Sequence, residues 1–428
     1  MTGWQGKLLR INLGSGLIET ELLAEDLLES YPGGCALARK LAQLENISTE
    51  NNKIIIAAGA LNGTGAPAAA FCGIAGYVDD VVCVSLPLHF GAEIKFCGYD
   101  VLIIEGKADG WSYVLIGEDV KILPIEELAD LNPLEIESII RSAFDQWRAS
   151  ETKIISIGDA EKFSPLLGLV TDGFVVNYTA KLASVFAEKH LKAIALRGIF
   201  DLKLARPSEF NQLITEAIKD FRDKQKNFEE KFYNIFQKVN IPLFSRIYAN
   251  EAEKIACFGC PIACLRKKKE KFLPDFIAIY CLNRMMGINS IQEALSLYDF
   301  CTQEGIDPVA LGLSARILIE LGRSGKFETP PLRAGDKKHI LHLLKDKDSL
   351  LHKKANLLAK EYEMESEFKE LEDSLKRIEK IIFSDIDGYD NKIKVIDALG
   401  FCPYILYLFP YELLVEMYQA ATGKLLKE

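Results

Sequence analysis

The sequence predicts an α+β fold in which a strand-rich region precedes a mainly helical one. Short apolar runs bounded by Gly, Asp or Asn recur through residues 1–200, which is typical of β-strands. From Pro207 onward, apolar residues recur about every 3.6 positions, the period of an α-helix. A chain of 428 residues with 49 % hydrophobic residues is long and apolar enough for two or three domains with a sizeable core.

The strand-rich region is expected to open with a β-hairpin. Residues 7–12 and 17–21 flank Gly14, Ser15 and Gly16, a run typical of a tight turn. Further strands are expected at 54–58, 81–86, 101–105, 113–116, 154–157 and 193–197. Helices are expected to interrupt these strands at 34–44, 133–149 and 180–187.

The second region is expected to be mainly helical. Ser208 is expected to cap a long amphipathic helix, and Gly305, Ile306 and Asp307 are expected to join a pair of helices. The helices of this region are expected at 208–239, 291–303, 308–321, 350–383 and 411–422. The composition changes near residues 201–206, which predicts two domains, 1–203 and 204–428.

Charge and hydropathy exclude several classes of protein. The chain has 61 acidic and 51 basic residues and a net charge of −10, which argues against general binding to nucleic acid or to anionic membranes. Residues 54–78 carry no charge, but five glycines and one proline interrupt them, so no membrane-spanning helix is expected. No apolar leader opens the chain, so we expect a cytoplasmic protein with reduced thiols.

The strongest chemical signal is a group of three cysteines, Cys257, Cys260 and Cys264. Thiols at these spacings can converge on one metal centre. A [4Fe–4S] cluster commonly takes four thiolates, often three from one group and one from a distant segment. The distant candidate is Cys402, because Gly400 allows the backbone to approach closely and Pro403 is a common neighbour of cluster cysteines.

Two other interpretations of these cysteines stay open. Structural zinc usually shows two Cys-x-x-Cys pairs or a Cys/His set, whereas this segment has one such pair and no histidine nearby. The thiols could also be buried and inert, as we expect for Cys281 and Cys301 on apolar helix faces. The sequence has no P-loop, G-x-G-x-x-G, H-E-x-x-H or G-x-S-x-G pattern, so no catalytic residue is assigned.

Several segments, in their order along the chain, together resemble the aldehyde ferredoxin oxidoreductase family of tungsten-pterin enzymes. These segments are residues 3–13, 32–41, 63–67, 90–100, 103–108, 156–158, 191–198, 257–264 and 397–402. The resemblance implies an N-terminal domain built on antiparallel sheets. It also implies that Cys257, Cys260, Cys264 and Cys402 hold a [4Fe–4S] cluster, and that Asp307 and Asp397 meet a tungsten or molybdenum bis-pterin.

The chain also departs from the family. It is much shorter than usual members, and a Lys/Glu-rich helix is expected where the family has segments that help to enclose a pterin and the active site. Residues 68–72 replace a Gly-Arg pair whose arginine reaches a pterin phosphate, 178–183 replace a glycine-rich stretch, and 273–277 lose a carboxylate. Because buried phosphates need cationic or backbone N–H partners, these changes favour the fold and the cluster over tungsten chemistry.

We therefore expect an iron–sulfur redox protein that passes electrons within a larger complex, with little or no pterin chemistry. Residues 266–269, Arg-Lys-Lys-Lys, follow the cysteine group directly and could steer an acidic ferredoxin or ferredoxin-like subunit. The resemblance also implies a homo- or hetero-oligomer. Two alternatives stay open: an active tungsten-pterin enzyme that oxidises aldehydes to carboxylates with ferredoxin as acceptor, and a non-redox structural subunit.

Overall fold

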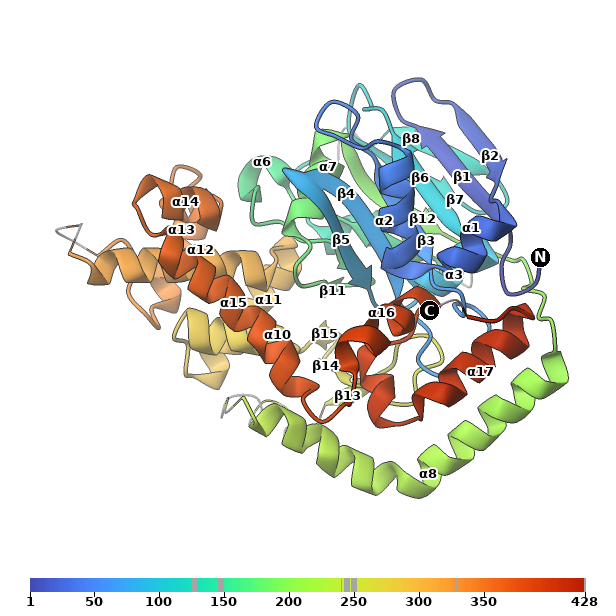
Figure 1. Cartoon of the computed structure of the whole chain (residues 1–428). Coiled ribbons are helices and arrows are strands. Elements are labelled where there is room, and N and C mark those ends of the chain that lie inside the picture. The colour runs from blue at the N-terminus through green and yellow to red at the C-terminus, as the bar shows by residue number, and fades with distance from the viewer. Residues whose placement is uncertain are drawn as a thin grey trace.

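The computed structural model describes residues 1–124, 129–144, 150–239, 241, 247, 252–325, 327 and 330–426. Two six-stranded sheets, coloured blue to green in Figure 1, lie together. The helices that follow residue 207 lie below and to the left of the sheets in this view (Figure 1). This arrangement confirms the predicted α+β fold. No helix within the described residues combines the length and the apolar character needed to cross a bilayer.

The first sheet contains the N-terminal hairpin and has the strand order β2-β1-β6-β3-β4-β5. Its strands are β1 (Lys7–Asn12), β2 (Ile18–Leu22), β3 (Ile54–Ala58), β4 (Cys72–Val78), β5 (Asp80–Leu86) and β6 (Val101–Glu105). All neighbouring pairs are antiparallel except β1 and β6. Strands β3 and β6 are almost entirely buried, which explains why their sequences are continuous apolar runs.

The second sheet has the order β11-β10-β9-β12-β7-β8 and one parallel pair, β12 with β7. Its strands are β7 (Ser112–Ile116), β8 (Val120–Pro124), β9 (Lys153–Ser156), β10 (Val170–Thr171), β11 (Phe174–Val175) and β12 (Leu191–Leu196). Helices α3 (Phe90–Phe96) and α7 (Ala180–Glu188) each contact strands of both sheets. The two sheets therefore share one apolar core, to which Ile56, Ile74, Val114 and Ile194 belong.

The other helices of the first 200 residues lie around these sheets. They are α1 (Glu25–Ser30), α2 (Gly34–Leu44), α4 (Pro133–Ser142) and α6 (Ala160–Phe163). Helix α2 packs directly on β4, because Gly73 has no side chain and a Cβ there would lie 2.3 Å from the backbone nitrogen of Cys35. The helix predicted at 133–149 ends at Ser142, and residues 145–149 lie outside the described residues.

The later part of the chain is mainly helical and also carries a small antiparallel sheet. The helices are α8 (Pro207–Gln237), α10 (Phe276–Tyr280), α11 (Ile291–Glu304), α12 (Pro308–Arg323), α13 (Lys337–Lys345), α14 (Ala355–Glu361), α15 (Glu365–Ile382), α16 (Tyr389–Leu399) and α17 (Tyr411–Thr422). The small sheet consists of β13 (Glu253–Ile255), β14 (Leu265–Lys268) and β15 (Lys271–Phe272), in that order.

The single helix predicted at 350–383 is wrong in one respect, because the chain forms three shorter pieces there. A 3₁₀ turn at Leu350–His352, α14 and α15 follow one another. Glu363 has a φ of +57°, and the N–H of Met364 donates to the carbonyl of Ala359, 2.7 Å away. The left-handed residue reverses the chain after α14, so the Lys/Glu-rich segment folds back instead of forming one rod.

Candidate metal centre and its cavity

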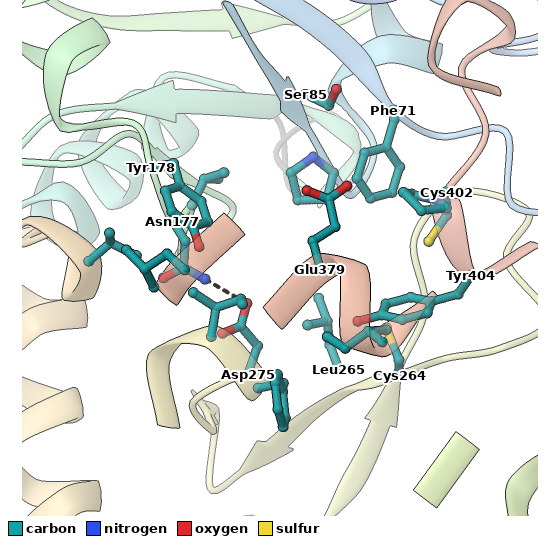
Figure 2. A pocket seen from close by; sticks show the side chains of 18 of the residues that line it. Phe71, Ser85, Asn177, Tyr178, Cys264, Leu265, Asp275, Glu379, Cys402 and Tyr404 are labelled. Carbon is teal, nitrogen blue, oxygen red and sulfur yellow. Dashed lines mark hydrogen bonds between the residues drawn. The ribbon is translucent and has the colours of Figure 1, made fainter. Parts of the chain in front are cut away.

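The four cysteines singled out by the sequence line one cavity. Cys257, Cys260, Cys264 and Cys402 all contribute to a cavity of about 640 Å³, and Figure 2 shows the side chains of Cys264 and Cys402 at its edge. The first three come from the loop between β13 and β14, and Cys402 follows α16. The fold therefore brings the late cysteine to the same place as the early group.

One loop, residues 59–71, holds the two cysteine segments together. The N–H of Ala68 donates to the carbonyl of Gly259 (3.1 Å), and the carbonyl of Ala68 accepts from the N–H of Cys402 (3.0 Å). The N–H of Phe71 donates to the carbonyl of Gly400 (2.9 Å). Each cysteine segment is thus fixed by backbone hydrogen bonds rather than by flexible side chains.

Glycine makes this close approach possible at Gly400. Its φ is +88°, and a Cβ there would lie 2.5 Å from the Nδ2 of Asn62. A Cβ on Gly59 would in turn lie 2.2 Å from the Cα of Gly400. The prediction that a glycine before Cys402 lets two backbones touch is confirmed.

Burial raises the pKa of all four thiols, which favours the protonated form in the absence of a metal. Burial raises the pKa of Cys257 to about 12. Burial and the neighbouring cysteines raise the pKa of Cys264 and of Cys402 well above its usual value. A bound metal centre would replace these protons, because thiolate rather than thiol is the ligand form.

Backbone N–H groups offset part of this effect at the sulfurs. Although burial raises the pKa of Cys260, hydrogen bonds from the backbone of Ala263 and Ile262 lower it. The backbone of Tyr404 acts in the same way on Cys402, and that of Leu88 on Cys257. Hydrogen bonds to cluster sulfurs are one of the features that set the reduction potential of an iron–sulfur protein.

The donor set at the cavity consists of four thiols. Four thiols surround the site, and each would bind a different iron. Zinc needs all its ligands around one ion at about 2.0–2.3 Å. Among the described residues, no group of three or more His, Cys, Asp or Glu side chains is arranged to hold a single metal ion. Four thiols are a donor set that a [4Fe–4S] cluster takes.

Four of the remaining cysteines are packing residues or lie away from the cavity. Cys281 and Cys301 are fully buried in the main apolar core, as the sequence predicted. Cys72 and Cys97 are buried in the same core. None of these four lines the cavity, so the cavity itself separates candidate ligands from packing thiols.

Asp307 caps two helices. It is the N-cap of α12, where its Oδ1 accepts from the N–H of Val309 (2.8 Å), and its Oδ2 accepts from the N–H of Ala180 (3.1 Å) at the start of α7. Burial raises the pKa of this carboxyl to about 6. Asp307 does not line the cavity, and its contact with a pterin stays a prediction.

Asp397 joins α16 to the start of α2. Its Oδ2 accepts from the N–H of Cys35 (2.8 Å), and its Oδ1 accepts from the hydroxyl of Ser85. Burial raises the pKa of this carboxyl. Asp397 does not line the cavity either. Its proposed role toward a pterin also stays a prediction.

The rest of the cavity wall is mostly aromatic and aliphatic, and the sequence did not point to it. Figure 2 shows Glu379 of α15 reaching into the cavity between Tyr178 and Phe71. Tyr389 donates to the Oε1 of Glu379 (2.8 Å). On the far side, the Nδ2 of Asn177 donates to Asp275 (2.7 Å). Phe71, Tyr178 and Asp275 lie in the three segments where the chain departs from the family's motifs. Glu379 and Tyr389 belong to no motif, so only their place in the fold identifies them.

The charges of this wall do not fit a phosphorylated bis-pterin. Glu372, Glu379 and Asp275 line the cavity, and among the described lining residues Lys376 is the only lysine or arginine. Phosphates need cations or unused backbone N–H groups. Glu372 and Glu379 are exposed, and the described wall offers a phosphate a single cationic side chain.

Two family models match this chain. Residues 8–198 match the family model "Aldehyde ferredoxin oxidoreductase, N-terminal domain". Residues 215–347 match "Aldehyde ferredoxin oxidoreductase, domains 2 & 3". Together the two models account for most of the chain.

Similar curated proteins come from species of Pyrococcus and Thermococcus. The tungsten-containing aldehyde ferredoxin oxidoreductases of Pyrococcus furiosus and Thermococcus kodakarensis are each 26 % identical over 392 residues, which cover 81 % of this chain and 64 % of the relative. The aliphatic sulfonate oxidoreductase WOR-like subunit of Pyrococcus furiosus is 21 % identical, covering 82 % and 65 %. The chain thus spans less than two thirds of the length of these relatives.

A solved structure shares the fold. The active-site complex BamBC of benzoyl coenzyme A reductase with 1,5-dienoyl-CoA superposes with a TM-score of 0.70 at 19 % identity, covering 84 % of this chain and 63 % of that one. At 19 % identity, the superposition shows a shared fold and no more.

Proposed function

The chain belongs to the aldehyde ferredoxin oxidoreductase family, and from this we propose that it is an iron–sulfur redox protein with two domains, 1–203 and 204–428. We assign one [4Fe–4S] cluster to Cys257, Cys260, Cys264 and Cys402. The observation that supports this assignment is that four cysteines, three from one loop and one from a distant segment, line one cavity. When bound, such a cluster supplies one-electron transfer.

The protein's own residues would position the cluster and exclude water from it. The loop 59–71 holds both ligand segments by backbone hydrogen bonds. Phe71, Leu265 and Tyr404 line the cavity beside the cysteines. An apolar wall lowers the local dielectric and so makes the reduction potential depend on the few N–H groups that reach the sulfurs.

A basic face next to the cysteine loop supports an acidic electron-transfer partner. In the small sheet, Lys254 pairs with Arg266, and Lys268 pairs with Lys271. Residues that are opposite one another in an antiparallel pair share a face, as do residues two apart in a strand. These four cations, here called the basic face, therefore share one side of the sheet, and Lys254, Lys268 and Lys271 are exposed.

We infer that the basic face docks an acidic ferredoxin or ferredoxin-like iron–sulfur subunit. The chain as a whole is acidic, so a local basic surface selects a complementary partner by charge. Strand β14 begins directly after Cys264, which would bring the partner close to the cluster. One relative is named as a subunit, and the structural neighbour is named as a complex. Both names support a role within a larger assembly.

The cluster is tested by iron and sulfide analysis of anaerobically purified protein. We expect about four irons per chain and the charge-transfer absorbance of an iron–sulfur protein. Cys402→Ser is expected to lose most of this iron, whereas Cys301→Ser, which removes a buried thiol outside the cavity, is expected to keep it. Full iron content and an unchanged electron paramagnetic resonance spectrum in Cys402→Ser would refute the fourth ligand.

A second candidate is an active tungsten-pterin aldehyde oxidoreductase, which the names of the relatives favour. The acidic cavity wall argues against it. Tungsten or molybdenum in stoichiometric amount, together with pterin fluorescence after denaturation, would establish this candidate instead. A colourless protein without iron would leave the third candidate, a non-redox structural subunit.

A further inference from the structure

Two cysteines outside the cavity contact each other between helix α2 and strand β5. Cys35 is the second residue of α2, and Cys83 lies in the middle of β5. The Sγ of Cys83 lies 3.9 Å from the carbonyl oxygen of Cys35, and the Sγ of Cys35 lies 3.5 Å from the hydroxyl oxygen of Ser85, two residues along β5 from Cys83. They come from segments 48 positions apart in the sequence, so the fold rather than a local turn brings them together.

The packing of α2 on the first sheet explains this contact. Cys83 pairs with Ala75 and Ser85 pairs with Gly73 across β4 and β5. All four residues therefore face the same side of the sheet, the side on which α2 lies. Because Gly73 has no side chain, the first turn of α2 comes down onto the sheet, next to Cys83 and Ser85.

Hydrogen bonds hold both cysteines in place from two sides. The N–H of Cys35 donates to Asp397, to which the Ser85 hydroxyl also donates. One turn further along α2, Arg39 donates to the carbonyls of Val81 and Cys83, each at 3.4 Å. The two Cα positions are thereby restrained. The helix segment that carries Cys35 is thus held against the strand that carries Cys83.

These two thiols also differ from the other cysteines in accessibility. Cys35 and Cys83 are partly exposed, as are Cys260 and Cys264 in the cavity. The remaining cysteines, Cys72, Cys97, Cys257, Cys281, Cys301 and Cys402, are buried. Outside the cavity, Cys35 and Cys83 are therefore the two cysteines with exposed surface.

We propose that Cys35 and Cys83 form a reversible disulfide by exchange with small-molecule disulfides such as oxidised glutathione. One protein thiolate attacks a sulfur of the reagent, which forms a mixed disulfide and releases one reagent thiolate. The second protein thiolate attacks the protein sulfur of that mixed disulfide and releases the other reagent thiolate. Two protein thiols are oxidised to one cystine, the reagent disulfide is reduced to two thiols, and the two protons pass from the protein to the released thiolates.

The surroundings of the pair make the exchange slow. A hydrogen bond with the Cys83 thiol, burial and the nearby Asp397 carboxylate raise the pKa of the Cys35 thiol well above its usual value. Since thiolate is the attacking form, reagent in excess and an incubation of hours are needed.

The test treats anaerobically purified holoprotein with excess oxidised glutathione, then labels it with N-ethylmaleimide and maps the peptides by mass. Before oxidation, label is expected on both Cys35 and Cys83. After oxidation, label is expected on neither, with one cross-linked peptide pair and a mass lower by two hydrogens. Dithiothreitol is expected to restore labelling of both.

Two variants make the result specific to this pair. Cys83→Ser is expected to stop at a single glutathione adduct on Cys35 and to form no cross-linked peptide, whereas Cys301→Ser is expected to behave as the wild type does. Undiminished labelling of both thiols in the oxidised wild type, or a stable glutathione adduct on each, would overturn the proposal. Because mapping follows Cys35 and Cys83 separately from the cavity cysteines, loss of the cluster assignment would leave this result unaffected.

Discussion

The N–H of Cys402 donates to the carbonyl of Ala68, with 3.0 Å between nitrogen and oxygen. The N–H of Ala68 in turn donates to the carbonyl of Gly259 in the cysteine loop. A single residue of the first sheet region thus connects the two segments that carry all four proposed ligands. Ala68 has a φ of +60° and is fully buried, so both its conformation and its size are restricted.

The first prediction concerns this connecting residue. A left-handed conformation costs an L-residue about 1–2 kcal/mol, and glycine at this position removes that strain. Glycine also raises the conformational entropy of the unfolded chain, which offsets part of the gain in stability. The free energy of unfolding of Ala68→Gly is therefore expected to lie within about 1 kcal/mol of the wild-type value, and the variant is expected to keep its iron. Ala68→Val adds a β-branched side chain at a buried left-handed position and is expected to lose both stability and iron. Urea unfolding and iron analysis measure the two effects, and full iron in Ala68→Val would contradict the role assigned to this residue.

The second prediction compares two glycines with similar backbone angles. Gly400 and Gly388 have φ values of +88° and +65°. A Cβ on Gly388 would meet nothing closer than 4.0 Å, whereas one on Gly400 would lie 2.5 Å from Asn62. Gly388→Ala is expected to cost about 1 kcal/mol, the conformational cost alone. Gly400→Ala is expected to cost more than about 2 kcal/mol and to lower iron content. Equal unfolding midpoints for the two variants would show that the contact with Asn62 relaxes freely.

The third prediction is a pH dependence of stability due to Asp307. Its pKa rises from 3.8 to about 6 on folding, because burial disfavours the charged form. Between these values the folded state holds a proton that the unfolded state has lost. Stability therefore falls as pH rises from about 4 to about 6, by up to about 3 kcal/mol for this shift.

Asp307→Asn removes the titrating group and is expected to flatten this part of the profile. The measurement is the free energy of unfolding in urea across pH 4–7. Asp336→Asn serves as the matched control, because Asp336 is the N-cap of α13 and accepts one hydrogen bond from the N–H of His339. A slope between pH 4 and pH 6 that is identical in the wild type and Asp307→Asn would disprove the assignment.

The fourth prediction addresses the basic face. Charge steering raises association rates by about 10- to 1,000-fold and weakens when salt shortens the Debye length. The double variant Lys254→Glu/Lys268→Glu is therefore expected to slow electron transfer from a reduced acidic ferredoxin about tenfold at low salt. At high salt the difference from the wild type is expected to disappear. Stopped-flow absorbance under anaerobic conditions follows the transfer.

The control for this experiment reverses the charge at two exposed lysines outside the basic face. Lys338→Glu/Lys347→Glu changes the net charge by the same amount, and both side chains are exposed in or after α13. If this control slows transfer as much as the basic-face variant does, net charge rather than a docking surface controls the reaction.

Local patterns predicted much of the fold and part of the candidate site. Strands such as β3 and β6 follow directly from buried apolar runs, and α11 and α12 from their helical periodicity and the turn at Gly305. The segment at 350–383 was predicted as one helix because its composition is helical throughout. Composition cannot show that Glu363 adopts a positive φ, which depends on the packing of α14.

The spacing of three cysteines indicated that they could share one centre, and the neighbouring Gly400 and Pro403 made Cys402 the best candidate to join them. These are local properties, set by spacing and by the conformations that glycine and proline allow. Long-range packing brings all four to one cavity and places α15 along its wall. It also sets Asp307 at the start of α12, Asp397 against the N–H of Cys35, and Cys35 against Cys83. Such contacts join residues far apart in the chain. They are decided by how whole helices and sheets bury their apolar faces, and no short stretch of sequence carries that information.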